Sequence, residues 1–271
     1  MNYRHAFHAG NHADVFKHAA LTLILAHLLQ KPAPFAVLDT HAGVGVYDLT
    51  SAGAQKTKEY EGGVGRVFGR ELAAASRYAA LLRDMNPAGV ITYPGSPEIV
   101  RRMLREQDRL ILCELHPADA AELKARYRSD PRVAVHHRDG YEAIGAFVPF
   151  PERRGLVLID PPYEAPDETA RVAAALTAGL GKWPTGIFAA WYPIKDGRIG
   201  DILAGAAAVG RFPKALRAEF CAYPHDGLTM AGGGLLIANA PWKLDEKLEA
   251  LCRELAPMLG NGGSSWTVKA L

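Results

Sequence analysis

Short apolar runs alternate along this chain with longer segments of helical periodicity, and this alternation constrains the fold more than any other feature. Each run is four to six residues long, rich in aliphatic residues, and bounded by polar residues, glycine or proline, as buried strands are. The five runs are 35–38, 109–113, 133–136, 156–159 and 186–191. Because helical patterns separate them, they predict an α/β fold with a mostly parallel, doubly wound sheet.

Helical patterns fill most of the gaps between these runs. We expect helices at 13–30, 96–106, 117–128, 166–180 and 245–259. Two further runs, 215–223 and 234–240, are expected to form an antiparallel pair that closes one edge of the sheet.

One spacing breaks the regular order. About seventy residues separate the first strand from the second, where a crossover between parallel strands needs only a few tens. We therefore predict a small helical insertion at 49–93, with 1–48 and 94–271 forming the main domain. Two helix-like pieces are expected within this stretch, at 58–71 and 73–85.

Composition limits the class of protein. The 271 residues are 49% apolar, which is enough for a sizeable core. The cysteines Cys113, Cys221 and Cys252 are odd in number and far apart, so we expect reduced, buried thiols rather than disulfides or a zinc site. No signal-peptide pattern and no apolar run of about 18 residues is present, so we expect a cytoplasmic protein without a membrane partner. The net charge of +2 means that any nucleic-acid contact depends on local basic patches.

The fourth predicted strand runs directly into Asp160, Pro161, Pro162 and Tyr163. Ligands of open α/β sheets bind beyond the carboxyl ends of the strands, and two prolines make the backbone there stiff. Asp160 and the Pro161 carbonyl can accept the two N–H groups of a planar exocyclic amine, while the Tyr163 ring stacks on the base. The plainer interpretation, a strand exit punctuated by prolines, is disfavoured by the buried strand and the aromatic residue.

The ends of the other predicted strands are polar as well. Gly43 and Gly45 follow the first strand and permit close approach of a ligand to the backbone, although a plain tight turn is an equal alternative. Glu114 ends the second strand, where a carboxylate can hold two ribose hydroxyls. Asp139 follows the third strand and can accept from an adenine amino group, while the Gly140 N–H serves a ring nitrogen. The pattern matches S-adenosylmethionine with an amine-bearing substrate beside it.

Taken together, the motifs resemble a known family. The matching segments are 3–18, 38–43, 93–97, 114–117, 139–140, 160–164, 191–193 and 241–244. They closely resemble those of the bacterial 23S ribosomal RNA adenine-N6 methyltransferases of the J type, over nearly the whole chain. The resemblance implies a Rossmann-like class I methyltransferase that uses S-adenosylmethionine to methylate N6 of one adenine in 23S ribosomal RNA.

The resemblance also implies roles for individual residues. The cofactor pocket would be lined by His18, His41, Ser96, Glu114, Asp139, Gly140 and Asp160. The substrate RNA would be contacted by Tyr3, Lys17, Pro161 and Tyr163, and Asp160 would be the catalytic acceptor. Reasoning from the strand ends alone points to Glu114, Asp139 and Asp160. The implied partner is 23S ribosomal RNA, and we expect a monomer without an obligate protein partner.

Charged and histidine-rich segments admit two interpretations each. His5, His8, His12 and His18 are expected to belong to a cap over the cofactor rather than to a metal cluster, because cysteines and a carboxylate triad are missing nearby. Residues 56–109 contain ten basic and seven acidic side chains. This mixture indicates either a solvated helical face or a helical lid that adds to an RNA surface.

Two other functions stay open at this point. A DNA adenine-N6 methyltransferase would share the chemistry of Asp160 through Tyr163, but no separate target-recognition domain is evident. A noncatalytic, nucleotide-binding RNA chaperone would retain the glycine turn and a basic surface, yet it would not need Asp160. A nicotinamide dehydrogenase is disfavoured because the full dinucleotide fingerprint is absent.

Overall fold

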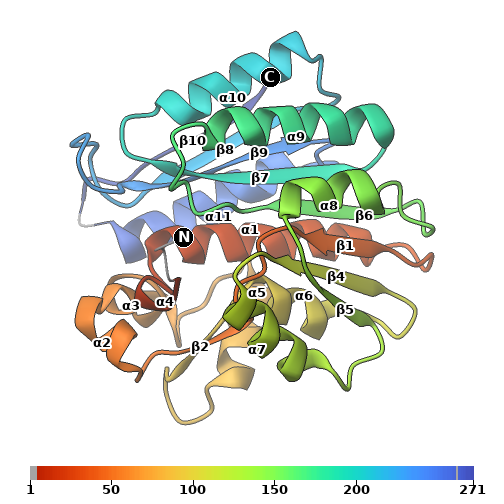
Figure 1. Cartoon of the computed structure of the whole chain (residues 1–271). Helices are drawn as coiled ribbons and strands as arrows, with labels where there is room; N and C mark the ends of the chain where they lie inside the picture. The colour runs from red at the N-terminus through yellow and green to blue at the C-terminus, as the bar shows by residue number, and fades with distance from the viewer. Residues whose placement is uncertain (1–4, 261) are drawn as a thin grey trace.

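Within residues 5–260 and 262–271, which the computed structural model describes, eight strands form one sheet with helices on both faces (Figure 1). The strand order is β10-β8-β9-β7-β6-β1-β4-β5. The expected parallel strands are β1 (Ala36–Asp39), β4 (Arg109–Glu114), β5 (Val133–His137), β6 (Gly155–Ile159) and β7 (Ile187–Ile194). They pair in parallel, with β1 between β6 and β4, so their carboxyl ends meet at one edge of the sheet.

The other half of the sheet is antiparallel. Strand β9 (Gly232–Ala238) lies between β7 and β8 (Leu216–Cys221) and pairs antiparallel with both, which confirms the predicted pair. That pair does not form the edge, because β10 (Ser265–Ala270) adds outside β8. Half-exposed, with Trp266 and Val268 at alternate positions packed against the core, β10 lacks the continuous apolar run that identified the other strands.

Two apolar layers sandwich the sheet. Along β6, Leu156 and Leu158 face one core cluster while Val157 and Ile159 face the other, as the two-residue period of a strand requires. Helices α1 (His12–Leu28), α6 (Ser96–Met103), α7 (Pro117–Tyr127) and α11 (Leu244–Leu259) contribute to the first cluster. Helices α8 (Gly140–Phe147), α9 (Glu168–Lys182) and α10 (Arg198–Val209) form the second (Figure 1).

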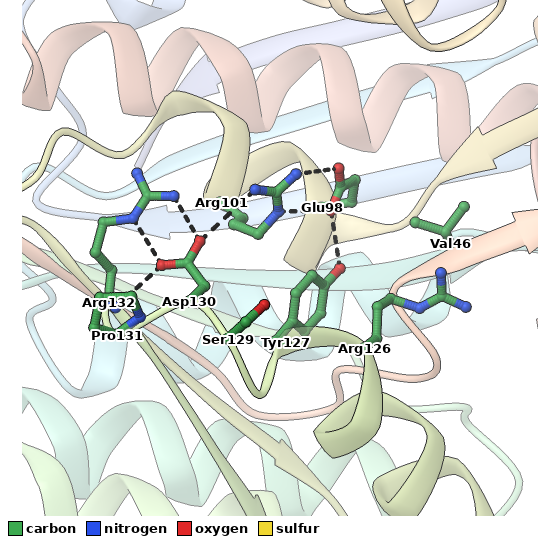
Figure 2. Close-up of a pocket in the computed structure, with 9 residues that line it drawn as sticks. All are labelled: Val46, Glu98, Arg101, Arg126, Tyr127, Ser129, Asp130, Pro131 and Arg132. Carbon is green, nitrogen blue, oxygen red and sulfur yellow. Dashed lines mark hydrogen bonds and ion pairs between the residues drawn. The ribbon is translucent and has the colours of Figure 1, made fainter.

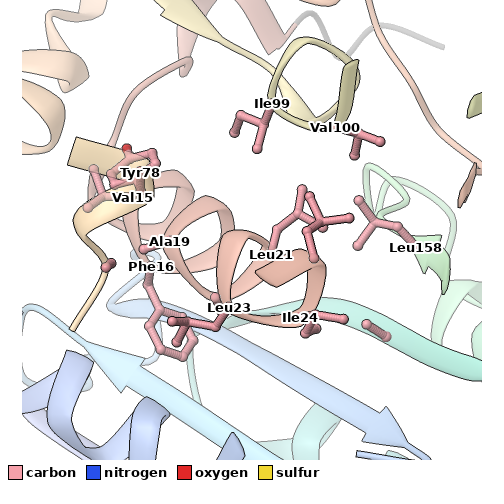
Figure 3. Packing of buried hydrophobic residues seen from close by; sticks show 14 of the residues in the cluster. Val15, Phe16, Ala19, Leu21, Leu23, Ile24, Tyr78, Ile99, Val100 and Leu158 are labelled. Carbon is pink, nitrogen blue, oxygen red and sulfur yellow. The ribbon is translucent and has the colours of Figure 1, made fainter. Parts of the chain in front are cut away.

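Helix α1 is buried on nearly all of its sides. Figure 3 shows its side chains packed against Ile99 and Val100 of α6, Tyr78, and Leu158 of β6. A helix that is apolar all round is typical of a protein interior. The polar residues that α1 nevertheless carries near its start are therefore candidates for function.

The insertion lies between two short paired strands, β2 (Val46–Asp48) and β3 (Thr92–Pro94). It contains the helices α2 (Ala52–Thr57), α3 (Glu59–Gly62), α4 (Val64–Val67) and α5 (Ser76–Met85). The prediction of one helix over 58–71 is wrong: Lys58 has a left-handed φ of 54° and Gly63 leaves helical geometry. A Cβ on Gly63 would lie 2.1 Å from the Gly10 carbonyl oxygen, so a tertiary contact breaks the helix there. The domain boundaries themselves stay a prediction.

One further expectation is met. Cys113, Cys221 and Cys252 are free and buried. Among the described helices, none has both the length and the apolar character needed to cross a membrane.

Candidate active site at the carboxyl ends of the parallel strands

Asp160 leaves the end of β6 into a turn that is conformationally restricted. Pro161 and Pro162 fix the backbone, and Tyr163 adopts a left-handed φ of 52°, which is uncommon for an aromatic residue. The Tyr163 hydroxyl donates a hydrogen bond of 3.0 Å to the carbonyl of Trp191 on β7, and the two rings meet edge to face at 6.0 Å. Burial, followed by the charge of Asp160, raises the pKa of Tyr163, so the phenol stays a neutral donor. The turn thus holds an aromatic ring beside Asp160.

Lys17 of α1 joins Asp160 to a second buried carboxylate. Its Nζ lies 2.6 Å from Asp160 Oδ2 and 2.9 Å from Asp14 Oδ1, and the lysine side chain is only 5% exposed. Asp14 also accepts from the Gly10 N–H and lies 2.9 Å from the His5 ring. Burial lowers the pKa of Lys17, but the charges of Asp14 and Asp160 outweigh it and raise that pKa overall. Burial likewise raises the pKa of Asp14, yet His5 and Lys17 bring it well below its ordinary value.

Trp191 completes the surroundings of Asp160. The Lys17 ammonium lies 5.2 Å from the centre of the indole ring, within cation–π range. From the sequence, Trp191 was recognised only as part of a matching motif, and Asp14 was given no role. The pairing of Lys17 with Asp160 spans 143 positions of sequence, so no local pattern could have revealed it. The predicted contact of Lys17 with RNA stays a prediction, since the described contacts of its ammonium are with carboxylates and Trp191.

The glycine turn after β1 is tied to Glu114 at the end of β4. The Gly43 N–H donates to Glu114 Oε2 at 2.8 Å, and the His116 N–H donates to Oε1 at 2.8 Å. Gly43 and Gly45 have φ of 60° and 83°, in the left-handed region that favours glycine. Each carboxylate oxygen of Glu114 retains a further lone pair, which is what two ribose hydroxyls would need.

A charged network supports the glycine turn from behind (Figure 2). The Tyr127 hydroxyl donates a hydrogen bond of 3.2 Å to the buried Glu98. It also lies close against Gly45, since a Cβ on Gly45 would be only 2.5 Å from this hydroxyl. Arg126 donates from Nε to the Val44 carbonyl at 3.0 Å. The arginines beside this network are themselves paired, Arg101 with Glu98 and Arg132 with Asp130. The residues drawn in Figure 2 therefore support the glycine turn, and their charges largely balance one another.

Asp139 and Gly140 lie where β5 passes into α8. Asp139 Oδ1 caps the helix by accepting from the Tyr141 N–H at 2.8 Å, and Oδ2 lies 3.2 Å from Arg171. A Cβ on Gly140 would lie 2.1 Å from the Thr40 carbonyl oxygen, so the glycine allows this turn to touch the end of β1. A structural role accounts for these contacts, and the cofactor role of both residues stays a prediction.

His41 and Ser96 border the end of β1. The His41 ring is 2.7 Å from the Thr40 hydroxyl, and burial lowers its pKa to about 4, so the ring is neutral at pH 7. Ser96, the first residue of α6, is buried beside Asp39.

Asp39, the last residue of β1, is fully buried. One of its oxygens, Oδ2, makes no hydrogen bond within normal limits, although Ser96 lies close enough to favour the ionised carboxylate. Burial raises the pKa of Asp39 to about 7 despite the opposing effect of Ser96, and the charge of Asp160 raises it further while Lys17 lowers it slightly. The strand edge therefore contains a buried acceptor with spare capacity.

His18 lies deeper, in the core between α1 and the insertion. Its Nδ1 is 2.8 Å from the Tyr93 hydroxyl, and burial, with Lys17, lowers its pKa to about 3. Its contact with a cofactor stays a prediction. Tyr3 lies outside the described residues. The other N-terminal histidines have separate neighbours: His5 is bound to Asp14, His8 to Glu59 at 2.7 Å, and His12 packs on Tyr223.

Comparison with known proteins identifies the family. The model for the family described as "Ribosomal RNA large subunit methyltransferase D, RlmJ" matches residues 32–271. A relative from Escherichia coli strain K12, named ribosomal RNA large subunit methyltransferase J, is 39% identical over 278 residues and covers 99% of both chains. A Haemophilus influenzae relative of the same name is 40% identical over 276 residues, covering 99% of this chain and 98% of its own. The chain belongs to this family.

Solved structures agree with this family assignment. The crystal structure of a Legionella pneumophila protein superposes with a TM-score of 0.90 at 34% identity, covering 97% of this chain and 98% of its own. A Corynebacterium glutamicum structure described as a probable spermidine synthase has a TM-score of 0.51 at 12% identity, covering 94% of this chain and 75% of its own. That more distant likeness reflects the fold alone, and the expected class I α/β architecture is confirmed.

The strand edge fits the expected cofactor of this methyltransferase family, S-adenosylmethionine. The unpaired Asp39 Oδ2 offers a buried acceptor suited to a cationic ligand. Gly43 and Gly45 leave the backbone open to close approach, and Glu114 has lone pairs left for a ribose. This edge of the sheet can therefore bind a cationic group and a ribose, and its backbone can approach the ligand closely.

Proposed function

We propose that this chain transfers a methyl group from S-adenosylmethionine to N6 of one adenine in 23S ribosomal RNA. The proposal rests above all on Asp160, which lies at the carboxyl end of β6, bound to Lys17 and flanked by Tyr163 and Trp191. Membership of a large-subunit ribosomal RNA methyltransferase family supports the substrate class.

The cofactor would lie along the ends of β1, β4 and β5. S-adenosylmethionine supplies a methyl group bonded to a positively charged sulfur, which makes that methyl group electrophilic. In the proposal, Glu114 binds the ribose, the glycine turn lies against the cofactor, and Asp39 accepts from its ammonium group. His18, His41, Ser96, Asp139 and Gly140 complete the proposed pocket.

The adenine amine would be held at Asp160. Its nitrogen is a poor nucleophile because the lone pair is delocalised into the ring. Asp160 and the Pro161 carbonyl would each accept one N–H, which favours a more tetrahedral nitrogen and aims its lone pair at the incoming carbon. Positioning of this kind supplies much of the rate in such reactions.

Lys17 orients Asp160. Lys17 binds Oδ2, whereas Oδ1 has no hydrogen-bond partner within residues 5–260 and 262–271 and is available to the amine. Because an ammonium group only donates, Asp160 meets it as an acceptor and presents its other oxygen to the amine as an acceptor too. Asp14, Lys17 and Asp160 together carry a net charge of −1, which stabilises the positive charge that develops on the nitrogen.

The aromatic residues would hold the base. Stacking of a base on an aromatic side chain contributes about 1–3 kcal/mol. The hydrogen bond from Tyr163 to the Trp191 carbonyl fixes the ring in place before the base arrives, so little order is lost on binding.

The test is a methylation assay with labelled S-adenosylmethionine on unmodified 23S RNA, with 16S RNA and duplex DNA as controls. Nuclease digestion then identifies the labelled nucleoside. We expect N6-methyladenosine from 23S RNA alone. Label in DNA would instead indicate a DNA methyltransferase, and cofactor and RNA binding without any label would indicate a noncatalytic RNA-binding protein.

The proposal extends to the state in which the protein acts. We infer a cytoplasmic monomer without an obligate protein partner. Sedimentation of the active protein at assay concentration tests this, and a stable dimer would contradict it.

A further inference from the structure

A second cavity, of about 410 Å³, lies at the opposite edge of the sheet, where β6 and β7 begin. Five of its lining side chains are basic, namely His27, Lys31, Arg153, Arg154 and Lys214, and none of the lining residues is acidic. Trp242 forms part of the rim and is 79% exposed. The cavity therefore combines concentrated positive charge with an exposed aromatic surface.

The positive charge of this basic cavity is not balanced locally. Lys31, Arg153 and Lys214 are exposed, and within the part of the chain that the structure describes none of them forms an ion pair. Arg154 is fixed in place by donating to the carbonyls of Leu28 and Ala33 rather than to a carboxylate.

The surroundings add to the same charge. Burial lowers the pKa of His27, and Lys247, Arg154 and Lys31 lower it further. Burial and the nearby Arg105 also lower the pKa of Arg154, and Asp108 only partly offsets them. These effects agree with the geometry in indicating a site for an anion.

The basic residues of α6 and of the segment that follows it behave differently. Arg101 and Arg102 bind Glu98, Arg105 binds Asp108, and Arg109 binds Glu152. With Lys58, which lies 3.8 Å from Glu61, five of the ten basic residues counted between positions 56 and 109 are held in these ion pairs. The unpaired cations of the basic cavity are a stronger attraction for a polyanion than those of α6.

Trp242 supplies a second, independent feature. It precedes α11 and is followed by Lys243, whose left-handed φ of 59° turns the chain sharply at the rim. The motif that contains it was singled out from the sequence but has no part in the methyl-transfer site. An exposed indole beside unpaired cations is the combination with which proteins hold single-stranded nucleic acid, since bases stack on the ring and phosphates meet the cations.

We propose that the basic cavity is a second RNA-binding site, which takes a phosphate among Lys31, Arg153 and Lys214 and stacks a base on Trp242. The inference rests on the proposed function and deepens it, because it assigns a contact to RNA remote from the target adenine. Strand β6, five residues long, separates the two edges by about 16 Å, so one nucleotide cannot reach both sites. A short RNA that carries only the target should not need the basic cavity, whereas a long RNA should.

The experiment compares a short hairpin containing the target with a 23S fragment of several hundred nucleotides. The variants are Trp242→Ala, Trp242→Phe, and the double variant Lys31→Gln with Lys214→Gln, with the exposed Lys269→Gln on β10 as the matched charge control. For the long RNA we expect Trp242→Ala and the double variant each to raise KM on the order of tenfold, with kcat and cofactor affinity unchanged. Trp242→Phe and Lys269→Gln should stay near wild type, and no variant should change KM for the hairpin.

Direct binding of the long RNA is measured in parallel, at several salt concentrations and without cofactor. The double variant should reduce the slope of log affinity against log salt by roughly 1 to 2. Equal losses of affinity for short and long RNA, or no loss for either, would overturn the proposal. Tight binding of AMP that quenches Trp242 fluorescence and is not displaced by long RNA would overturn it as well. RNA binding can be measured without methyl transfer. If the protein is inactive but these variants still lower its affinity for RNA, the proposed function is refuted and the second RNA-binding site is not.

Discussion

Replacing Lys17 with methionine tests the buried charge arrangement most directly. Methionine keeps the length and apolar stem of lysine but removes the cation that lies between Asp14 and Asp160. Breaking a buried ion pair by removing one partner costs about 3–5 kcal/mol. We expect the lower end, about 3 kcal/mol, because Asp14 keeps its bonds from His5 and the Gly10 N–H.

The loss of stability should depend on pH. In the wild type the pKa of Asp14 is depressed, so its contribution is present above the unfolded pKa of about 3.9 and is lost only as pH falls through the lower folded value. Without Lys17, one of the charges that oppose the effect of burial is lost, so the folded pKa of Asp14 rises. Protonation of Asp14 then relieves the unpaired charge. The difference in free energy of unfolding between the variant and the wild type should therefore be largest at pH 7.5 and smaller at pH 5.

Urea unfolding of both proteins at these two pH values measures this difference. The control is Lys58→Met, which removes an exposed lysine from a pair of 3.8 Å and should change stability by less than about 1 kcal/mol. In methylation assays Lys17→Met should lower kcat on the order of 10²-fold, because Asp160 loses the contact that orients it. A destabilisation equal at both pH values, or kcat near wild type, would refute the role given to Lys17.

Three other substitutions give distinct readouts. Asp160→Ala should abolish methyl transfer while cofactor affinity, measured by calorimetry, changes little; turnover near wild type would contradict its assignment. Tyr127→Phe removes the bond to Glu98 behind the glycine turn, worth about 1 kcal/mol, and should raise KM for S-adenosylmethionine several-fold without changing kcat. Asp39, with its pKa raised to about 7, makes the ligand-free fold less stable as pH rises from about 4 to 7, because the folded state holds the proton more tightly. Asp39→Asn should flatten that decline in urea unfolding, and an unchanged slope would mean that the carboxylate is not strained.

The fold was predictable where burial leaves a strong pattern in the sequence. The run from Leu156 to Ile159 is apolar throughout because helices cover both faces of β6, and the same holds for β1 and β4. Strand β10 could not be found in this way, since its Ser265–Ala270 stretch is exposed on the edge. The break at Gly63 depends on its contact with Gly10, which no local propensity reports.

The same division holds for the candidate site. Asp160, Glu114 and the glycine turn were visible because a polar residue directly after a buried strand must lie at the sheet edge. The roles of Lys17 and Trp191 depend on α1 and β7 meeting β6, and the sequence alone does not specify that packing. Asp139 also lies at a strand end, but its carboxylate caps α8 there. Its position alone therefore does not distinguish a structural role from cofactor binding.

The way in which the insertion is attached has a consequence for how this family can vary. Val46 pairs with Pro94, and the Gly95 N–H binds the Gly45 carbonyl at 2.9 Å, so both ends of the insertion meet directly beside the glycine turn. Their separation is set by this two-stranded stalk and not by the chain between them. Loops within the insertion can therefore lengthen or shorten without displacing either the glycine turn or Ser96, which makes the insertion a place where substrate preference can diverge while the methyl-transfer chemistry is retained.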